Sequence, residues 1–183
     1  YGQNKIMPSS KPEKGVNDLA TLCHAIAAEA DGWDPSRVTS SSGKKMPWKC
    51  KEGHQWIAVI SARTNQSQGC PVCTNRKVWV GFNDLKTKFP ELAAEADGWD
   101  PSTVLAGTHK KMPWKCKKGH TWENFVFQRS FGSRGCPYCA NKKLWKGFND
   151  LKTKFPEVAS EADGWDPSTV IAGTHKKMPW KCK

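Results

Sequence analysis

The sequence predicts an α+β fold made of small units in tandem, each with short helices before a β-hairpin. Three observations predict it. The chain repeats with a period of 66 residues, seen in the Asn-Asp-Leu tripeptides that begin at Asn17, Asn83 and Asn149. After each tripeptide, apolar residues fall three and four positions apart, which is typical of helices. Closely spaced cysteine and histidine residues then flank a segment with strand character.

The period divides the chain into segments. Residues 81–117 and 147–183 differ at only 3 of 37 positions, so the units are interpreted one at a time. We predict an arm or linker at 1–14, repeat 1 at 15–80, repeat 2 at 81–146 and the front of repeat 3 at 147–183. Because the chain begins at Tyr1 and stops one residue after Cys182, we expect it to be a piece of a longer protein.

Each repeat opens with helix signals. The asparagine of each tripeptide is a suitable N-cap, and the acid that follows it favours the positive end of the helix dipole. In repeat 2, Pro90 cannot lie inside a continuous helix, so we expect two short helices that meet there. The sequence Gly-Trp-Asp-Pro then ends the helix, with Gly98 as C-cap and Pro101 blocking continuation.

Two pairs of soft metal ligands follow in each complete repeat. Pairs separated by two or three residues suit a tetrahedral ion, because a tight turn directs both side chains at one point. Gly53 and Gly119 supply the positive φ that such a turn needs. We therefore predict two structural Zn²⁺ ions. Their ligands are Cys50, His54, Cys70 and Cys73 in repeat 1, and Cys116, His120, Cys136 and Cys139 in repeat 2.

The alternatives explain the pattern less well. Disulfides would leave the histidines without a role, and cysteines two residues apart pair poorly with each other. Iron suits four thiolates, whereas an imidazole in each set favours zinc. A set of four protein ligands is closed, which is typical of a structural site. Cys182 takes a ligand position in an incomplete third site, whereas Cys23 aligns with Phe89 and is predicted to be a buried apolar residue.

The hairpin is predicted from the first ligand pair. The residues that follow it, Trp56–Ser61 and Trp122–Phe127, have strand character, so the ligand pair forms the turn. In a unit this small a metal supplements a limited core, and we expect most of the ten tryptophans to belong to that core.

Charge is unevenly distributed. The net charge is +12, yet residues 81–103 carry −3 and residues 104–146 carry +9, and repeat 1 is divided in the same way. A solvated surface would explain basic residues, but their segregation in both repeats favours a surface that faces a polyanion. The sequence has no apolar run long enough to span a membrane, no visible signal peptide and no catalytic motif. Thiolate sites favour a reducing, intracellular compartment, and we expect no enzyme activity, no membrane partner and no small-molecule substrate.

The motifs Trp-Lys-Cys-x2-Gly-His-x-Trp (from Trp48 and Trp114) and Gly-Cys-Pro-x-Cys (from Gly69 and Gly135) together resemble a known family. It comprises the zinc-ribbon or treble-clef-like zinc-finger repeats found in tandem arrays in bacterial and viral proteins, some fused to nuclease domains. The resemblance covers two complete repeats and the front of a third. It implies zinc binding, and nucleic-acid binding by association; Arg63 and Arg129 match the family's arginine after the hairpin.

We therefore predict a zinc-binding tandem module that binds DNA or RNA through basic contacts to phosphate. Two other readings stay open: a protein-interaction adaptor in a larger assembly that can contain RNA, and the targeting part of a nuclease outside this chain. The candidate nucleic-acid contacts are Lys44, Lys45, Lys49, Lys51, Arg63, Arg76 and Lys77 in repeat 1, and Lys110, Lys111, Lys115, Lys117, Arg129, Arg134, Lys142 and Lys143 in repeat 2.

Overall fold

The computed structural model describes residues 11–182, so most of the predicted arm lies outside the described residues. The chain forms two units, Tyr1–Trp79 and Val80–Lys183. The first contains repeat 1, and the second contains repeat 2 with the front of repeat 3. Among the residues described, no helix is both long and apolar enough to cross a membrane.

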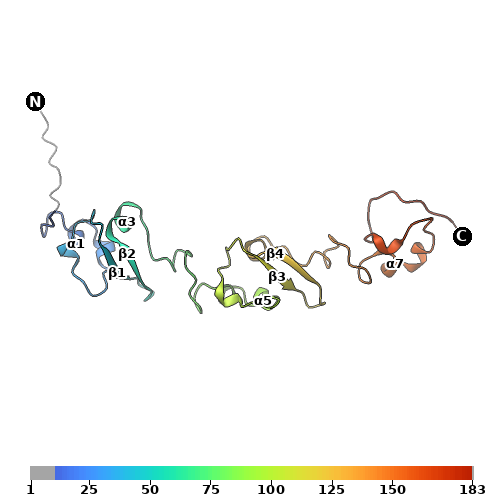
Figure 1. The fold of residues 1–183 in the computed structure, drawn as a ribbon, viewed down its shortest axis with the longest axis horizontal. Helices are drawn as coiled ribbons and strands as arrows, with labels where there is room; N and C mark the ends of the chain where they lie inside the picture. The colour runs from blue at the N-terminus through green and yellow to red at the C-terminus, as the bar shows by residue number, and fades with distance from the viewer. Residues whose placement is uncertain (1–10, 183) are drawn as a thin grey trace, which may run out of the picture. The chain divides into compact units, whose positions relative to one another are not determined.

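Both complete repeats have the predicted order of short helices followed by a hairpin, and each adds a helix after the hairpin that was not predicted (Figure 1). Repeat 1 contains α1 (Leu19–Leu22), α2 (His24–Ala27), the 3-10 helix η1 (Pro35–Arg37), β1 (Lys45–Lys49), β2 (Gln55–Val59) and α3 (Ile60–Asn65). Repeat 2 contains α4 (Leu85–Lys88), α5 (Pro90–Ala93), η2 (Pro101–Thr103), β3 (Lys111–Lys115), β4 (Thr121–Phe125) and α6 (Val126–Ser130). Repeat 3 contains α7 (Leu151–Lys154), α8 (Pro156–Ala159) and η3 (Pro167–Thr169).

The helix starts correct one prediction. The N-cap is the aspartate of each tripeptide, and not Asn17, Asn83 or Asn149. In repeat 2, the buried Asp84 carboxylate accepts hydrogen bonds from the Thr87 backbone N–H and hydroxyl and from the Gly81 N–H. One carboxylate satisfies several donors at the helix start, which a neutral asparagine amide does less well.

The end of the helical segment also differs from prediction. As expected, α4 and α5 meet at Pro90. However, α5 ends with Ala94 as its C-cap, and Gly98, whose φ is +77°, lies in a bend beyond it. The Asp-Pro pair begins η2, because the Asp100 carboxylate accepts from the Ser102 N–H and Pro101 takes the first position. The sequence Gly-Trp-Asp-Pro therefore starts a helical turn instead of ending one.

The hairpins are antiparallel, with Trp48 opposite Trp56 and Trp114 opposite Trp122. Each is shorter than predicted. The second strand ends at Val59 or Phe125, and the chain then turns into α3 or α6. The residues that follow bury every third position instead of every second, which is the period of a helix.

A tryptophan lies at the centre of each core. Trp48 and Trp114 are fully buried, and the neighbouring Trp33 or Trp99 meets each ring edge to face at 5.1–5.2 Å. Backbone hydrogen bonds join the helices to the hairpin, including Lys115 N–H to the Glu95 carbonyl at 2.8 Å. The prediction of core tryptophans therefore holds for these positions. It fails for Trp79 and Trp145, which stay 45% and 36% exposed.

Candidate metal centres

The first ligand pair sits in the hairpin turn. Cys50 directly follows β1 and His54 directly precedes β2. The Cys50 N–H donates to the His54 carbonyl, and the Gly53 N–H donates back to the Cys50 carbonyl at 2.9 Å. Gly53 has a φ of +82°, a conformation that an L-residue adopts only with strain. Repeat 2 reproduces this turn, with Gly119 at +84°.

The second ligand pair lies in a tight turn after the third helix of each repeat. In repeat 1, the Thr74 N–H donates to the Cys70 carbonyl, and the Arg76 and Lys77 N–H groups both donate to the Pro71 carbonyl. The corresponding turn in repeat 2 has the same hydrogen bonds from Lys142 and Lys143 to Pro137.

The four predicted ligands of each repeat converge on one point. In repeat 1, His54 Nδ1 lies 3.4, 3.7 and 3.4 Å from the sulfur atoms of Cys50, Cys70 and Cys73. In repeat 2, His120 Nδ1 lies 3.5, 3.6 and 3.4 Å from those of Cys116, Cys136 and Cys139. Two sulfur atoms in each set are 3.8 or 3.9 Å apart. A tetrahedral ion with Zn–S bonds of about 2.3 Å and a Zn–N bond of about 2.0 Å needs ligand atoms roughly 3.5 to 3.8 Å apart.

The acid–base chemistry of the thiols also fits a cation. Desolvation, together with hydrogen bonds and repulsion from the neighbouring sulfur atoms, raises the pKa of Cys73 to about 12 and that of Cys139 to about 11. In each set another thiol, Cys70 or Cys116, has its pKa lowered: burial alone would raise it, but hydrogen bonds from backbone N–H groups and from the neighbouring thiols outweigh that effect. One thiolate in each set is therefore favoured at the expense of another. A coordinating zinc ion supplies the positive charge that keeps such thiols deprotonated. The residues present thus fit two structural zinc ions, one in each complete repeat.

Aromatic side chains cover each zinc histidine. In repeat 1 the Trp79 ring meets His54 at 5.3 Å. In repeat 2 three rings surround His120: Phe148 at 4.2 Å, Trp145 at 4.9 Å and Tyr138 at 5.6 Å. These rings were not predicted to lie at the metal site, although the two tryptophans recur at the same place after the second ligand pair. Their position shows that the exposed tryptophans shield the metal site instead of filling the core.

Asn149, predicted as an N-cap, has a different role. It is 1% exposed, and its side-chain amide donates to the carbonyls of Tyr138 and Lys143 while its oxygen accepts from the Trp145 N–H. Asn149, at the start of repeat 3, is therefore hydrogen-bonded to the turn of repeat 2 that carries Cys136 and Cys139 and to the residues just after it.

The two other cysteines, Cys23 and Cys182, lie outside the two ligand sets. Cys23 packs partly buried against the core of repeat 1, between α1 and α2, and belongs to neither ligand set. Cys182 is exposed, and within the described residues it joins no group of metal ligands.

Two predicted nucleic-acid contacts are wrong. Arg63 and Arg129 are 5% and 9% exposed. Each pairs with a glutamate of the helical half of its repeat (residues 15–37 or 81–103): Arg63 with Glu29 at 2.5 Å, and Arg129 with Glu95. Each guanidinium also lies over two indole rings, 4.4 to 5.1 Å from their centres. These arginines join the two halves of a repeat and are not available to an external phosphate. The recurrence of a glutamate 34 residues before each arginine was the signal for this pair.

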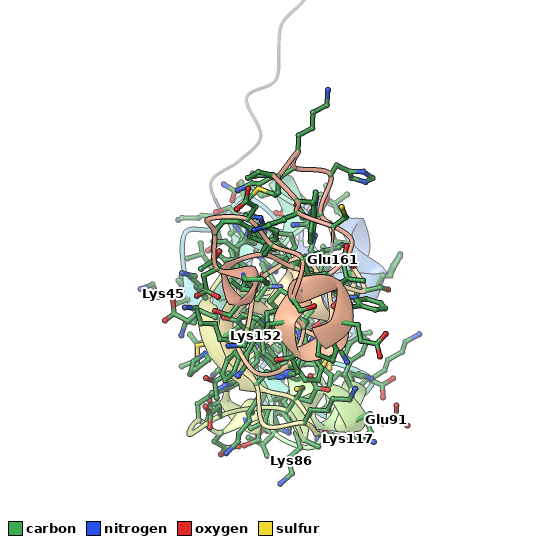
Figure 2. The ribbon with its side chains drawn as sticks, turned by 90° about the vertical axis from the view of Figure 1, so that its right-hand side faces the viewer. Lys45, Lys86, Glu91, Lys117, Lys152 and Glu161 are labelled. Carbon is green, nitrogen blue, oxygen red and sulfur yellow. The ribbon has the colours of Figure 1, made fainter. Side chains whose placement is uncertain are left out.

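The remaining predicted basic contacts are exposed side chains. In Figure 2, Lys45 and Lys117 extend outward from the ribbon. Among the others, Arg76 donates to the Gly69 carbonyl at 2.8 Å, and Lys111 pairs with the exposed Glu123 at 2.8 Å. The exposed set is Lys44, Lys45, Lys49, Lys51, Arg76 and Lys77 in repeat 1, and Lys110, Lys111, Lys115, Lys117, Arg134, Lys142 and Lys143 in repeat 2.

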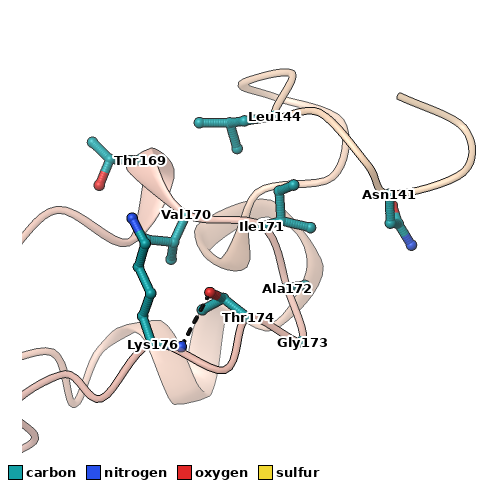
Figure 3. Close-up of a pocket in the computed structure, with 9 residues that line it drawn as sticks. All are labelled: Asn141, Leu144, Thr169, Val170, Ile171, Ala172, Gly173, Thr174 and Lys176. Atoms are coloured by element: carbon teal, nitrogen blue, oxygen red, sulfur yellow. Dashed lines mark hydrogen bonds between the residues drawn. The ribbon is translucent and has the colours of Figure 1, made fainter. Parts of the chain in front are cut away.

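A pocket lies within the second unit, between the residues after the last zinc turn and repeat 3 (Figure 3). It encloses about 340 Å³ and is lined by apolar side chains such as Leu144 and Ile171. Lys176 is the one charged residue in the lining, and its backbone N–H donates to the Thr174 hydroxyl at 3.3 Å. We interpret the pocket as a gap in the packing between two segments and not as a reaction site.

One comparison identifies relatives of the chain. The sequence profile of a family described as a probable treble clef zinc finger domain matches twice in tandem, at residues 27–76 and 91–142. Each match contains one complete set of zinc ligands. No curated protein matches the chain.

Proposed function

Because this chain belongs to the family of probable treble clef zinc finger domains, we propose that its two zinc-binding repeats bind DNA or RNA through lysine contacts to phosphate. The zinc ions have a structural role in this proposal. Each has four protein ligands, which leaves no open position for a substrate, and we propose no enzyme activity for these residues. Three thiolates per site favour a reducing, intracellular location.

The observation that carries the proposal is the separation of charge within each repeat. The helical half supplies Glu29 and Glu95, which neutralise the buried arginines. The basic residues left on the zinc half (38–80 in repeat 1 and 104–146 in repeat 2) are therefore nearly all exposed lysines. Between residues 104 and 146 the single acid is Glu123. Lysines neutralise phosphates as point charges and carry little sequence information, so we expect affinity without strong sequence preference.

One observation favours a second candidate, a protein-interaction adaptor. Ile57, on the outer face of the repeat 1 hairpin, is 73% exposed. The corresponding residue in repeat 2 is Glu123. A large apolar side chain that stays exposed on a hairpin is a feature of protein contact surfaces.

Filter binding at several salt concentrations tests the proposal. If about six phosphates are contacted, the slope of log K against log salt on duplex DNA should be near −5, from about −0.9 per phosphate. Reversing Lys110, Lys111, Lys142 and Lys143 to Glu should weaken binding on every sequence alike and make the slope shallower. Zinc content should stay at two ions per chain.

A matched control reverses four exposed lysines of the helical halves in the same unit, Lys86, Lys88, Lys152 and Lys154. The change in net charge is identical, so a smaller loss with this variant assigns binding to the zinc half. Equal losses would indicate a response to net charge alone. Unchanged binding by the zinc-half variant would reject the proposal and favour the adaptor.

A further inference from the structure

Repeat 2 carries a band of aromatic side chains on its surface that repeat 1 lacks. We call it the aromatic strip and define it as His109, Phe125, Phe127 and Phe131. Phe131 is 67% exposed and Phe125 38%, and His109 is also exposed. A small protein loses solubility by exposing several large rings close together, so a strip of this kind indicates a binding surface.

Three of the four rings contact one another, and the fourth, Phe131, follows Phe127 by one helical turn. His109 stacks on Phe127, with ring centres 4.2 Å apart and planes 26° apart, and Phe125 lies 6.0 Å from Phe127. Phe127 and Phe131 are four residues apart along α6, where the Phe131 N–H donates to the Phe127 carbonyl, so both side chains share one side of that turn.

The strip rests on fixed structure. The Phe131 ring packs edge to face on Phe89 at 5.6 Å. Backbone hydrogen bonds from Phe127 to Thr108 and from Val126 to Lys110 hold the loop that carries His109 against the start of α6. The rings are therefore oriented before any ligand arrives, which lowers the entropy cost of binding.

Repeat 1 has the same backbone elements without the rings. At the positions of His109, Phe125, Phe127 and Phe131 it has Gly43, Val59, Ser61 and Asn65. The fold and the zinc site thus form without aromatic residues at these places. The strip is an addition to repeat 2, and the requirements of folding do not account for it.

Basic side chains adjoin the strip. Lys110 and Lys111 follow His109 directly, and Lys111 is the hairpin partner of Phe125. The segment from Gly107 to Lys118 contains five lysines and no acid, and Glu123, the nearby acid, is paired with Lys111. This charge fits a polyanion better than an apolar partner surface.

We propose that the aromatic strip stacks unpaired bases, so that repeat 2 binds single-stranded nucleic acid in preference to duplex. This inference rests on the nucleic-acid binding proposed above and names the form of nucleic acid. Lysines can contact the phosphates of either form, so they do not select a single strand. Only a single strand offers free base faces, because the bases of a duplex already stack on one another.

The test measures binding of the zinc-loaded 183-residue chain to a labelled single strand and to a duplex of equal length, over a salt series. The variant F125V/F131N introduces the residues of repeat 1, which that fold accepts. We expect single-strand affinity to fall about tenfold, equivalent to about 1.4 kcal/mol, and duplex affinity to change less than about twofold. The salt slope should stay constant, because no charge is removed.

Two further variants keep the result interpretable. F125L/F131L retains apolar bulk over Phe89 but has no ring faces, so it should lose the same single-strand affinity. F155L alters an exposed phenylalanine of repeat 3 and should lose none. A single strand with 2-aminopurine should show fluorescence quenching on binding to the original chain and much less on binding to F125L/F131L.

The possible results distinguish this inference from the proposed nucleic-acid binding on which it rests. If the original chain binds neither nucleic acid, the proposed function has failed, and the inference fails with it. If it binds both and the phenylalanine variants lose no affinity for the single strand, or lose as much for duplex, the stacking proposal is wrong while the lysine contacts remain. Retained nucleic-acid binding with loss of a protein partner would assign the strip to that partner.

Discussion

Repeat 1 and repeat 2 bury corresponding residues, whereas several of their exposed positions carry different residues. Leu19 and Leu85, Trp48 and Trp114, and the two sets of zinc ligands occupy equivalent places in both. The outer positions diverge, from Ile57 to Glu123 and from Asn65 to Phe131. The shared buried residues and zinc ligands therefore identify what folding needs. The residues that differ are where the two repeats can acquire different partners.

Loss of a zinc ligand is expected to have the largest effect on one repeat relative to the other. Cys50→Ser should unfold the zinc half of repeat 1 alone, and Cys116→Ser that of repeat 2, because the binding energy of a structural zinc, about 10 kcal/mol or more, exceeds the stability of so small a unit. Elemental analysis should give one zinc per chain in each variant and two in the original. Two zinc ions in either variant, or iron in the original chain, would contradict the ligand assignment.

The buried arginines provide the next test. Arg129→Met should destabilise repeat 2 by about 3 kcal/mol, because it leaves the partly buried Glu95 unpaired and removes a cation from two indole faces. Arg63→Met should do the same in repeat 1. Lys111→Met breaks the exposed pair with Glu123 and should cost less than about 1 kcal/mol. Amide hydrogen exchange resolves the repeats separately, and equal costs for Arg129→Met and Lys111→Met would show that burial of the pair is unimportant.

A smaller loss of stability is expected at Cys23, the repeat 1 residue that corresponds to Phe89 in repeat 2. Cys23→Ala should cost about 1 kcal/mol in repeat 1 and leave two zinc ions per chain, because the side chain only packs against the core. Phe89→Ala removes a larger ring that also supports Phe131, so it should cost more. Loss of one zinc from Cys23→Ala would mean that this thiol belongs to a metal site.

Sequence spacing was sufficient to predict the zinc sites, since ligands in a tight turn converge through local geometry. It was also sufficient for the break at Pro90, which has a local cause. It failed where the outcome depends on distant residues. Asn149 and Asp150 are both good N-caps by type, and the choice between them depends on the carbonyls of Tyr138 and Lys143, which draw the asparagine away.

Arg63 shows the same limit for the candidate site. By residue type it matched the lysines around it as a phosphate contact. Its burial follows from the approach of Glu29 and two tryptophans, which come from other parts of the repeat.

The fastening of Phe148 and Asn149 onto the zinc turn of repeat 2 bears on how such an array can be rearranged during evolution. A deletion that begins at residue 147 would take away the ring nearest His120 and the amide that bonds two carbonyls. A crossover inside the helices that follow keeps both, since each recombinant chain still has a Phe-Asn-Asp behind the zinc turn. We therefore expect that gain or loss of a repeat is tolerated best when the breakpoint falls within the helices that open a repeat. A breakpoint at the boundary between two repeats, such as residue 147, should be tolerated less well.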